Sequence, residues 1–246
     1  MKAMILAAGL GTRLAPLTND RPKALVTLNG RTLLEICLER LRSAGVTEVI
    51  VNTHHFAGMV ARYLAAHGNF GMRVEISREE VLLDTGGGLK QAASFFLKGA
   101  EDNQPFLVHN ADVISNIDLP LLLRHHRESN ALATLAVQDR TTSRYLLFDD
   151  EGLLCGRRAG GDAAPELVRP VDNPKPLAFC GIHAASPRLF SLLSEEGAFP
   201  LVPAWLRLAA RGEKIAGFRA DPYRWRDLGR PESLRAAEEE VRAGLL

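Results

Sequence analysis

The chain has little that would indicate a secreted, membrane-bound or nucleic-acid-binding protein. It has only three cysteines, Cys37, Cys155 and Cys180, and they lie far apart. Their odd number and wide spacing exclude a disulfide framework and a zinc knuckle, so we interpret them as reduced packing residues of a cytoplasmic protein. Thirty basic residues against 29 acidic ones give a formal net charge of +1. Because this balance provides no general attraction for nucleic acid or anionic membranes, any anion site must be local.

Long hydrophobic runs are also absent. No segment approaches the roughly 18 consecutive apolar residues of a membrane-spanning helix. The N-terminal stretch MKAMILAAGLGTR has some features of a secretory leader, because Lys2 precedes apolar and small residues. Its apolar run is short, however, and Arg13 ends it. We therefore expect a buried strand that leads into a loop rather than a signal peptide.

The sequence contains no internal repeat, no low-complexity block and no convincing interdomain linker. Short apolar runs alternate with amphipathic segments through the first half, which is typical of βαβ units around a mostly parallel sheet. We therefore predict an α/β protein, a Rossmann-like three-layer α/β/α sandwich with a mixed, mostly parallel central sheet. We expect residues 1–246 to form one domain, with a functional half at about 1–140 and another at about 141–246.

The individual elements follow from hydrophobic periodicity. Leu34, Cys37, Leu38 and Leu41 share one helical face, and Thr32 with Glu35 forms a capping box before them. Further helices are predicted at Gly58–Ala66, Leu89–Phe96, Leu119–Arg127, Val202–Arg211 and Pro231–Arg242. Strands are predicted at Ala3–Ala7, Glu48–Asn52, Arg73–Ser77, Phe106–His109, Ala133–Val137, Tyr145–Phe148, Phe179–His183 and Lys214–Arg219. The polar stretch 157–176, RRAGGDAAPELVRPVDNPKP, is interpreted as a surface loop.

The first loop has the composition of an anion site. Gly9 and Gly11 let the backbone turn sharply and bring amide groups close to a ligand. Arg13 and Lys23 add a guanidinium that can fork onto phosphate oxygens and a compact ammonium charge. A Rossmann loop would need glycine in place of Leu14, and the Gly-Lys-Ser/Thr of a P-loop is absent. On these residues alone, a turn with two solvated basic side chains remains an alternative.

A longer match is specific. LAAGLGTRLAPLTNDRPKAL resembles the signature of the sugar-1-phosphate nucleotidyltransferases, the pyrophosphorylases that make nucleotide sugars. The resemblance implies the nucleotide-diphospho-sugar transferase type of fold. It also implies that Lys23 meets the phosphates of both substrates and that the loop wraps the base and triphosphate of the nucleotide. The loop residues concerned are Ala7, Ala8, Gly9, Gly11, Thr12 and Arg13.

Two aspartates are candidates for a magnesium site, because triphosphates travel with Mg²⁺, which binds few protein carboxylates. VHNAD places Asn110 and Asp112 at the carboxyl end of a predicted central strand, where open α/β sheets bind ligands. YRWRDLGRPESL places Asp227 after an apolar-edged strand and before a helix, and it resembles the second metal-binding segment of the family. Either aspartate alone could be an ordinary turn or capping residue.

The chemistry implied by the resemblance needs no general base, since a sugar-1-phosphate is mostly dianionic near pH 7 with a second pKa of about 6. A phosphate oxygen would attack the α-phosphorus of the nucleotide in line, and pyrophosphate would leave. The candidate catalytic residues are therefore Arg13, Lys23, Asp112 and Asp227, with Mg²⁺ held by the two aspartates. Because the basic and acidic residues of the whole sequence nearly cancel, we expect no nucleic-acid or membrane partner.

The identity of the substrates rests on weaker features. Thr85, Gly86 and Gly87, in LLDTGGGLKQA, are expected to contact the base, because this glycine run resembles muramate-type uridylyltransferases of cell-wall recycling. UTP and N-acetylmuramate-1-phosphate are therefore favoured, with mannose-1-phosphate guanylylation and choline-phosphate cytidylylation as alternatives. Lys23, Asn110 and Gly181 are the expected contacts of the sugar phosphate, the last because FCGIH resembles the strand that passes the sugar ring.

Some features suggest no site. The seven histidines lack zinc spacing and are interpreted as structural or solvent-facing, Trp205 as a core residue, and Lys175 as a surface lysine. A noncatalytic protein that senses nucleotide sugars is the alternative from another class. Retention of the full phosphate and metal set argues against it. We expect a monomer or small homo-oligomer, without the acyltransferase repeats of larger relatives.

Overall fold

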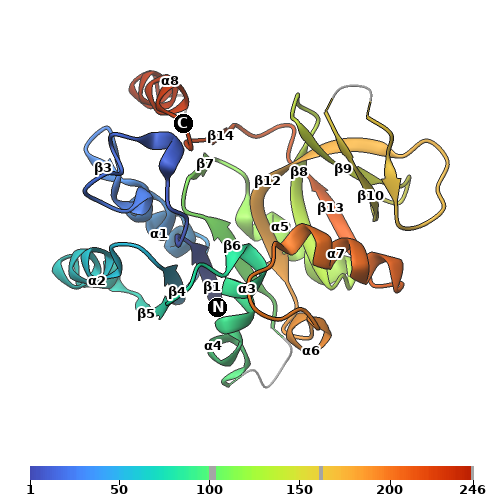
Figure 1. Ribbon diagram of the computed structural model, residues 1–246, viewed down its shortest axis with the longest axis horizontal. Coiled ribbons are helices and arrows are strands. Elements are labelled where there is room, and N and C mark those ends of the chain that lie inside the picture. The colour runs from blue at the N-terminus through green and yellow to red at the C-terminus, as the bar shows by residue number, and fades with distance from the viewer. Residues whose placement is uncertain (100–103, 161–162, 245–246) are drawn as a thin grey trace.

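A single ten-stranded sheet runs through the fold, and its two parts differ in strand direction (Figure 1). The computed structural model describes residues 1–99, 104–160 and 163–244. The central strands, in spatial order, are β5 (Arg73–Arg78), β4 (Glu48–Thr53), β1 (Lys2–Leu6), β6 (Phe106–Asn110), β12 (Lys175–Ala185), β8 (Ala133–Gln138) and β13 (Ile215–Arg219). All of these run in one direction except β12, which is antiparallel to both neighbours. The predicted mixed, mostly parallel sheet is confirmed.

Helices cover both faces of this sheet. Along β1, Ile5 packs into one core and Met4 into the other, as the alternation of side chains in a strand requires. The core around Ile5 is closed by α1 (Leu33–Ser43), α2 (Ala57–Ala66) and α5 (Leu119–Ser129). The core around Met4 is closed by α3 (Asp84–Gln91), α4 (Ala93–Leu97), α6 (Leu189–Leu192) and α7 (Leu201–Ala210). This arrangement is the predicted three-layer sandwich.

A second, antiparallel part of the sheet extends from β12. It consists of β9 (Arg144–Phe148), β10 (Leu154–Ala159) and β11 (Glu166–Leu167). The prediction of a surface loop over 157–176 is therefore wrong at both ends and in the middle, because 157–159 belongs to β10, Glu166–Leu167 forms β11 and 175–176 begins β12. Residues 161–162 lie outside the described part. Gly156 and the arginines beside it hid β10, because they interrupt the apolar pattern of a strand. Gly156 has a packing reason, since an added Cβ would lie 2.5 Å from the Glu166 carbonyl oxygen.

Most helix predictions hold, with one exception. Thr32 caps α1, and its Oγ1 accepts a hydrogen bond of 3.1 Å from the Glu35 amide. Asp118 caps α5 in the same way through the Leu121 amide, at 2.8 Å. The prediction of a single helix at Leu89–Phe96 is wrong. α3 begins earlier, at Asp84, and the helical structure is interrupted at Ala92 before α4.

Several short elements surround the carboxyl ends of the parallel strands. They are the 3₁₀ turns Thr12–Leu14 and Lys23–Leu25, the hairpin β2 (Thr27–Leu28) and β3 (Arg31–Thr32), the strand pair β7 (Val113–Ser115) and β14 (Trp225–Asp227), and α8 (Pro231–Arg242). A further 3₁₀ segment, Gly68–Gly71, follows α2. Leu14, Leu28, Ile114, Leu228 and Leu234 bury one another in a third small core. This core fixes the first loop against β14 and α8.

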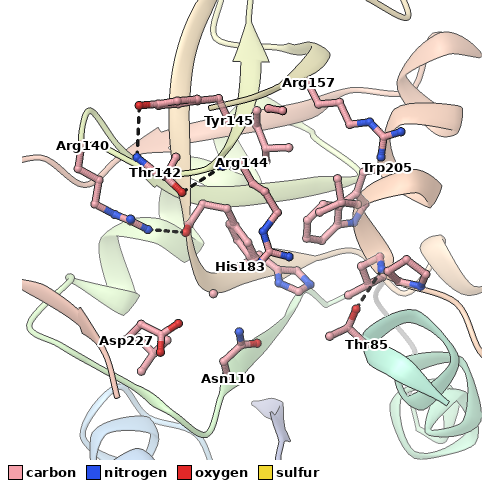
Figure 2. Close-up of a pocket in the computed structure, with 18 of the residues that line it drawn as sticks. Thr85, Asn110, Arg140, Thr142, Arg144, Tyr145, Arg157, His183, Trp205 and Asp227 are labelled. Carbon is pink, nitrogen blue, oxygen red and sulfur yellow. Dashed lines mark hydrogen bonds between the residues drawn. The ribbon is translucent and has the colours of Figure 1, made fainter. Parts of the chain in front are cut away.

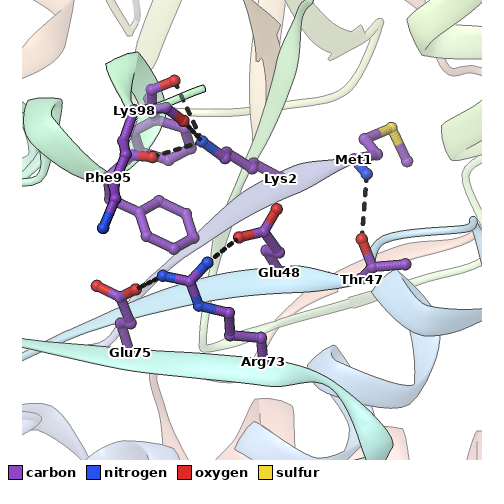
Figure 3. Close-up of polar contacts among 9 residues, drawn as sticks. Met1, Lys2, Thr47, Glu48, Arg73, Glu75, Phe95 and Lys98 are labelled. Atoms are coloured by element: carbon purple, nitrogen blue, oxygen red, sulfur yellow. Dashed lines mark hydrogen bonds and ion pairs between the residues drawn. The ribbon is translucent and has the colours of Figure 1, made fainter. Parts of the chain in front are cut away.

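The opposite ends of the parallel strands are joined by polar contacts (Figure 3). The Lys2 ammonium donates to the Phe95 carbonyl oxygen at 2.7 Å, which joins β1 to α4. Arg73 on β5 donates to the Glu48 carboxylate on β4 at 2.8 Å. These contacts tie together the amino ends of the parallel strands. The carboxyl ends of the same strands carry the loops that form the site. In the described residues, no helix is long and apolar enough to cross a lipid bilayer.

Candidate active site

In the first loop, Gly11 has a backbone conformation that only glycine adopts easily. Its φ is +67°, and an added Cβ would lie 3.0 Å from Thr18 Cγ2 and 3.1 Å from Lys23 Cβ. The Thr18 hydroxyl donates to the Gly11 carbonyl oxygen at 2.9 Å and closes the turn. Gly9, in contrast, has no neighbour within 4 Å of its Cβ position and lies in open space. The loop thus combines a fixed turn with an exposed backbone stretch.

The start of this loop is attached to the protein interior through two buried polar residues. The Ala7 amide donates to Asn52 Oδ1 at 2.7 Å, and Asn52 Nδ2 donates to Glu79 Oε1 at the same distance. Glu79 is only 1% exposed, and its other oxygen accepts from the Leu83 amide at 2.9 Å. Sequence reasoning missed Asn52 and Glu79 as positioning residues, although both lie in the segments VNTHH and ISREE. The network connects the loop to the first turn of α3.

The four residues predicted to be catalytic meet at one point. Lys23 forms an ion pair with Asp112, and both side chains are largely buried. Asp227 lies on the neighbouring strand: the Leu228 amide donates to the Asp112 carbonyl oxygen at 2.8 Å. The convergence is clearest at Gly229, where an added Cβ would lie 2.6 Å from Asp227 Oδ1, 2.8 Å from Arg13 Nη2 and 3.3 Å from Lys23 Nζ. These four side chains come from segments up to two hundred residues apart.

The two aspartates fit a magnesium ion. Across the described ranges, no group of three or more histidine, cysteine, aspartate or glutamate side chains could hold a metal. Asp112 lies just before β7, and Asp227 lies at the end of β14, which pairs with β7. Both are hard oxygen donors, and each keeps one carboxylate oxygen without a hydrogen-bond partner among these residues. Mg²⁺ suits such a pair, because it takes one or two protein carboxylates and completes its shell with phosphate oxygens and waters.

A cavity of about 1320 Å³ opens beside this convergence and extends between the parallel and antiparallel parts of the sheet. Arg13, Thr85, Asn110, Gly181 and Asp227 line it, as expected for site residues. The other residues predicted for the site are not among its lining residues: Ala7, Ala8, Gly9, Gly11, Thr12, Lys23, Gly86, Gly87 and Asp112. Its volume is above the roughly 300–1,000 Å³ of most small-molecule sites, which suits two substrates held together.

Asn110 and Gly181 form one unit of the cavity floor. Gly181 on β12 has a φ of +71°, and an added Cβ would lie 2.7 Å from Asn110 Nδ2 and 3.1 Å from Val113 Cγ2. Only glycine lets β12 pass this close to the end of β6. The prediction that these two residues belong together is in agreement with their contact, while their role in binding stays a prediction.

The glycine run at 86–88 differs from what we expected. The three glycines do not precede a helix but lie buried inside α3. An added Cβ on Gly86 would lie 2.3 Å from the Phe199 ring, and one on Gly87 would lie 2.4 Å from the Gly197 carbonyl oxygen. The close approach that these glycines permit is therefore to the segment before α7. Thr85 alone of this group lines the cavity, and its hydroxyl accepts from the Leu201 amide at 3.0 Å (Figure 2).

Sequence reasoning predicted Arg13 but missed the other arginines of the cavity. Among the described residues these are Arg140, Arg144, Arg157, Arg158, Arg226 and Arg230. Arg140 is the most constrained, because its guanidinium stacks 3.7 Å from the centre of the Trp225 ring and donates to the Phe179 carbonyl oxygen at 2.9 Å. Burial lowers the pKa of Arg140 below its ordinary value, although nearby Cys180 and Asp227 favour the charged form. The signal was present in RTTSRY and CGRR, where arginines recur within a few residues.

The far wall of the cavity is formed by His183 on β12 and Trp205 on α7. Their rings meet edge to face with centroids 5.0 Å apart, and the side chains are 2% and 1% exposed. Trp205 is thus a core residue, as predicted, which also faces the cavity. Burial lowers the pKa of His183 to about 3, so its imidazole is neutral near pH 7. The structural interpretation of the histidines overlooked that His183 lines the cavity.

Other predictions concern residues outside the site. Cys37, Cys155 and Cys180 are buried and unpaired, in agreement with their interpretation as packing residues. Lys175 is exposed and forms an ion pair of 3.0 Å with Asp150, so it is a surface lysine. It does not reach the cavity.

Comparisons with known proteins agree with this geometry. The family model described as Nucleotidyl transferase matches residues 2–149. An N-acetylmuramate alpha-1-phosphate uridylyltransferase of Caulobacter vibrioides is 36% identical over 97% of this chain and 96% of its own length. A mannose-1-phosphate guanyltransferase of Yarrowia lipolytica is 29% identical over 95% of this chain and 62% of its own length.

The fold has close counterparts among solved structures. UDP-glucose pyrophosphorylase from Acinetobacter baumanii superimposes with a TM-score of 0.78 at 19% identity, over 96% of this chain and 91% of that one. At this identity the likeness shows the shared fold. The family model and the Caulobacter relative carry the assignment further. The chain belongs to the nucleotidyl transferase family and is a sugar-1-phosphate nucleotidyltransferase.

Proposed function

We propose that the protein transfers a uridylyl group from UTP to N-acetylmuramate-1-phosphate, with Mg²⁺ as cofactor, and releases pyrophosphate. The convergence of Arg13, Lys23, Asp112 and Asp227 at one end of a large cavity supports the transfer most directly. The choice of base and sugar is supported by the Caulobacter relative, which matches this chain almost end to end.

The reaction exchanges one phosphoanhydride bond for another. An oxygen of the dianionic sugar phosphate attacks the α-phosphorus of UTP in line; the new O–P bond forms as the bond to pyrophosphate breaks, and pyrophosphate carries away the electron pair. No proton must be removed first, because the second phosphate pKa is about 6. The protein therefore contributes alignment and positive charge rather than a general base.

Each converging side chain has a separate task in this scheme. Lys23 supplies a compact positive charge at the crowded α-phosphate, and the fork of Arg13 binds the departing pyrophosphate. Asp112 and Asp227 would hold Mg²⁺, which when bound neutralises phosphate charge and favours the in-line geometry. Lys23 also balances the charge of Asp112, so that this largely buried carboxylate is paired.

Guanylyl transfer to mannose-1-phosphate is the second candidate. A specific observation favours it, since the Yarrowia relative is 29% identical over 95% of this chain. Both readings use the same four residues and differ only in the base and sugar contacts. A substrate matrix therefore separates them without any change to the chemistry.

The test is pyrophosphate release from four nucleoside triphosphates, each combined with several sugar-1-phosphates, in Mg²⁺ and in excess chelator. We expect the highest kcat/KM for UTP with N-acetylmuramate-1-phosphate and loss of activity in chelator. Lys23→Gln should lower kcat by roughly 100-fold or more, as loss of a transition-state charge contact does. Lys175→Gln, a surface lysine change outside the cavity, is the matched control and should leave kcat unchanged.

Two outcomes would overturn the proposal at different levels. Preference for GTP with mannose-1-phosphate would replace the proposed substrates with the second candidate. Full activity in chelator, or a Lys23→Gln enzyme as fast as wild type, would remove the proposed cofactor or the proposed role of the lysine.

A further inference from the structure

Several arginines line the cavity away from the convergence at Asp227. Arg157 is paired with Glu166 at 2.6 Å, and Arg140 is held between the Trp225 ring and the Phe179 carbonyl oxygen. In the described part of the chain, the guanidinium groups of Arg144 and Arg158 have no ion-pair or hydrogen-bond partner. Arg158 lies over the Tyr145 ring, 5.3 Å from its centre, whereas Arg144 has no such contact among these residues.

Arg144 points into the cavity rather than away from it. Figure 2 shows its guanidinium on the side of His183 and Trp205, while Asp227 and Asn110 lie on the other side. The reacting phosphates are expected at Asp227, where Arg13 and Lys23 converge. A charge at Arg144 therefore faces the part of the sugar that is remote from the reacting phosphate.

The wall beside Arg144 contains two buried polar atoms, His183 Nε2 and Trp205 Nε1. Neither atom has a hydrogen-bond partner among the residues that the structure describes, and the two side chains are 2% and 1% exposed. Buried polar groups in proteins are nearly always hydrogen-bonded, so an unpaired pair in the wall of a cavity indicates a polar ligand there. Trp205 Nε1 can only donate, which requires an acceptor on that ligand.

We propose that Arg144, with Trp205 Nε1 and His183 Nε2, binds a carboxylate on the sugar, so that the enzyme selects acidic sugar-1-phosphates over neutral ones. A carboxylate offers several acceptor positions to a guanidinium fork and to a neighbouring indole N–H. A neutral hydroxyl leaves the guanidinium charge without a counter-charge. This inference rests on the proposed function, because N-acetylmuramate differs from N-acetylglucosamine by a lactyl ether that ends in a carboxylate.

The neutral imidazole of His183 suits this arrangement. Two donors, Arg144 and Trp205, face the same region, and His183 completes its wall without adding a second fixed charge. Arg144 is assigned as the charge that recognises the acid, because Arg157 is paired with Glu166 and Arg158 lies over the Tyr145 ring. Since Arg144 is exposed and unpaired, its replacement should leave the fold intact.

The experiment compares kcat/KM for N-acetylmuramate-1-phosphate and for N-acetylglucosamine-1-phosphate, with the preferred nucleotide of the wild-type enzyme. Arg144→Gln should lower kcat/KM for the acidic sugar by roughly 10- to 100-fold, the usual effect of losing a hydrogen bond between charged groups. It should change kcat/KM for the neutral sugar less than about 3-fold. Arg144→Lys should fall between Arg144→Gln and wild type, because an ammonium keeps the charge but lacks the fork.

Two further variants separate a specific effect from a general one. Trp205→Phe removes the indole N–H and keeps the aromatic packing, and it should lower the preference for the acidic sugar several-fold. Arg124→Gln, an exposed arginine on α5 outside the cavity, should leave both substrates unaffected. Thermal unfolding of each variant checks that the fold is retained.

The outcomes distinguish this inference from the proposed function. If the wild-type enzyme uses both sugars equally well, or Arg144→Gln slows both equally, the carboxylate site is refuted while nucleotidyl transfer stands. If no substrate pair turns over, calorimetric binding of the same two sugar phosphates decides. Tighter binding of the acidic sugar that is lost in Arg144→Gln supports the carboxylate site, and equal binding overturns it.

Discussion

Gly229 allows a direct test of the convergence on which the proposed reaction depends. A methyl group placed there by Gly229→Ala would lie 2.6 Å from Asp227 Oδ1 and 2.8 Å from Arg13 Nη2, whereas ordinary contacts of such a carbon begin at 3.4 Å. Each of these atoms must therefore move by more than half an ångström, and Lys23 Nζ is close behind at 3.3 Å. Misplacement of catalytic groups by about 1 Å can cost about 100-fold in rate.

The same substitution should have little effect on folding. The φ of Gly229 is not in the left-handed region, and the crowded atoms are the mobile ends of side chains rather than backbone. A glycine-to-alanine change at a compatible position stabilises by about 0.4–1 kcal/mol through the unfolded chain. We therefore expect kcat/KM to fall roughly 30- to 100-fold, about 2–2.7 kcal/mol in activation free energy, with an unchanged or slightly higher Tm.

Gly58→Ala is the matched control for this prediction. Gly58 is exposed on α2, its Cβ position is 3.5 Å from the nearest atom, and it is outside the cavity. It should share any gain in stability and keep full activity in the pyrophosphate assay. A Gly229→Ala enzyme with kcat/KM within about 3-fold of wild type would show that the four side chains do not act together at this point.

Two further predictions concern stability. Gly86→Ala forces a methyl group to within 2.3 Å of the Phe199 ring, so overpacking should destabilise the fold by about 1–3 kcal/mol. Adding Phe199→Leu should restore part of this loss in denaturant titrations. An unchanged unfolding midpoint in Gly86→Ala would contradict the prediction. Burial lowers the pKa values of His109 and His126 to about 4 and of His183 to about 3, so the unfolded chain, with values near 6.5, binds more protons. Stability should be full above about pH 7 and fall as the pH drops toward 4, by about 2 kcal/mol per imidazole at pH 5. In His126→Gln this loss should shrink by one imidazole's share, and equal stability of wild type at pH 7 and pH 5 would refute the argument.

The parts of the fold that the sequence predicted are those in which one face of an element is buried. The register of Leu34, Cys37, Leu38 and Leu41 fixed α1, because a helix with that stripe has a single way to face the sheet. Strands such as β4 were predicted equally well, since a short apolar run between turn residues is typical of a buried strand. Local pattern and global fold agree at these places.

The predictions failed where tertiary contacts decide the local structure. Gly86, Gly87 and Gly88 have low helix propensity and indicate a turn, yet all three lie in α3. Glycine is needed at these positions because any side chain would collide with Phe199, Gly197 or Glu79. Those contacts involve residues more than a hundred positions away for the first two glycines. No local window of the sequence contains that information.

The same division applies to the site. Arg13, Lys23 and Asp112 were predicted together because they lie in contiguous motifs with a family resemblance. Arg144, His183 and Trp205 were not predicted as cavity residues, because they come from three separate segments that meet only after folding. An arginine near a turn has no distinctive pattern until its neighbours are known.

The strand β12 connects the two ends physically. Its second half, from Ile182 onward, pairs with β6 and belongs to the parallel sheet, whereas Lys175–Leu177 pairs with β9 of the antiparallel part. Gly181 lies at the change of neighbours, where the register with β8 is also irregular. Because Gly181 lies against Asn110 and His183 follows two residues later in the cavity wall, a shift of β12 would move both parts of the cavity together. The sheet thus fixes the distance between the end of the cavity at Asp227 and the wall beside Arg144. In the proposed function, this distance determines whether a carboxylate on the sugar can reach Arg144 while the phosphate reacts.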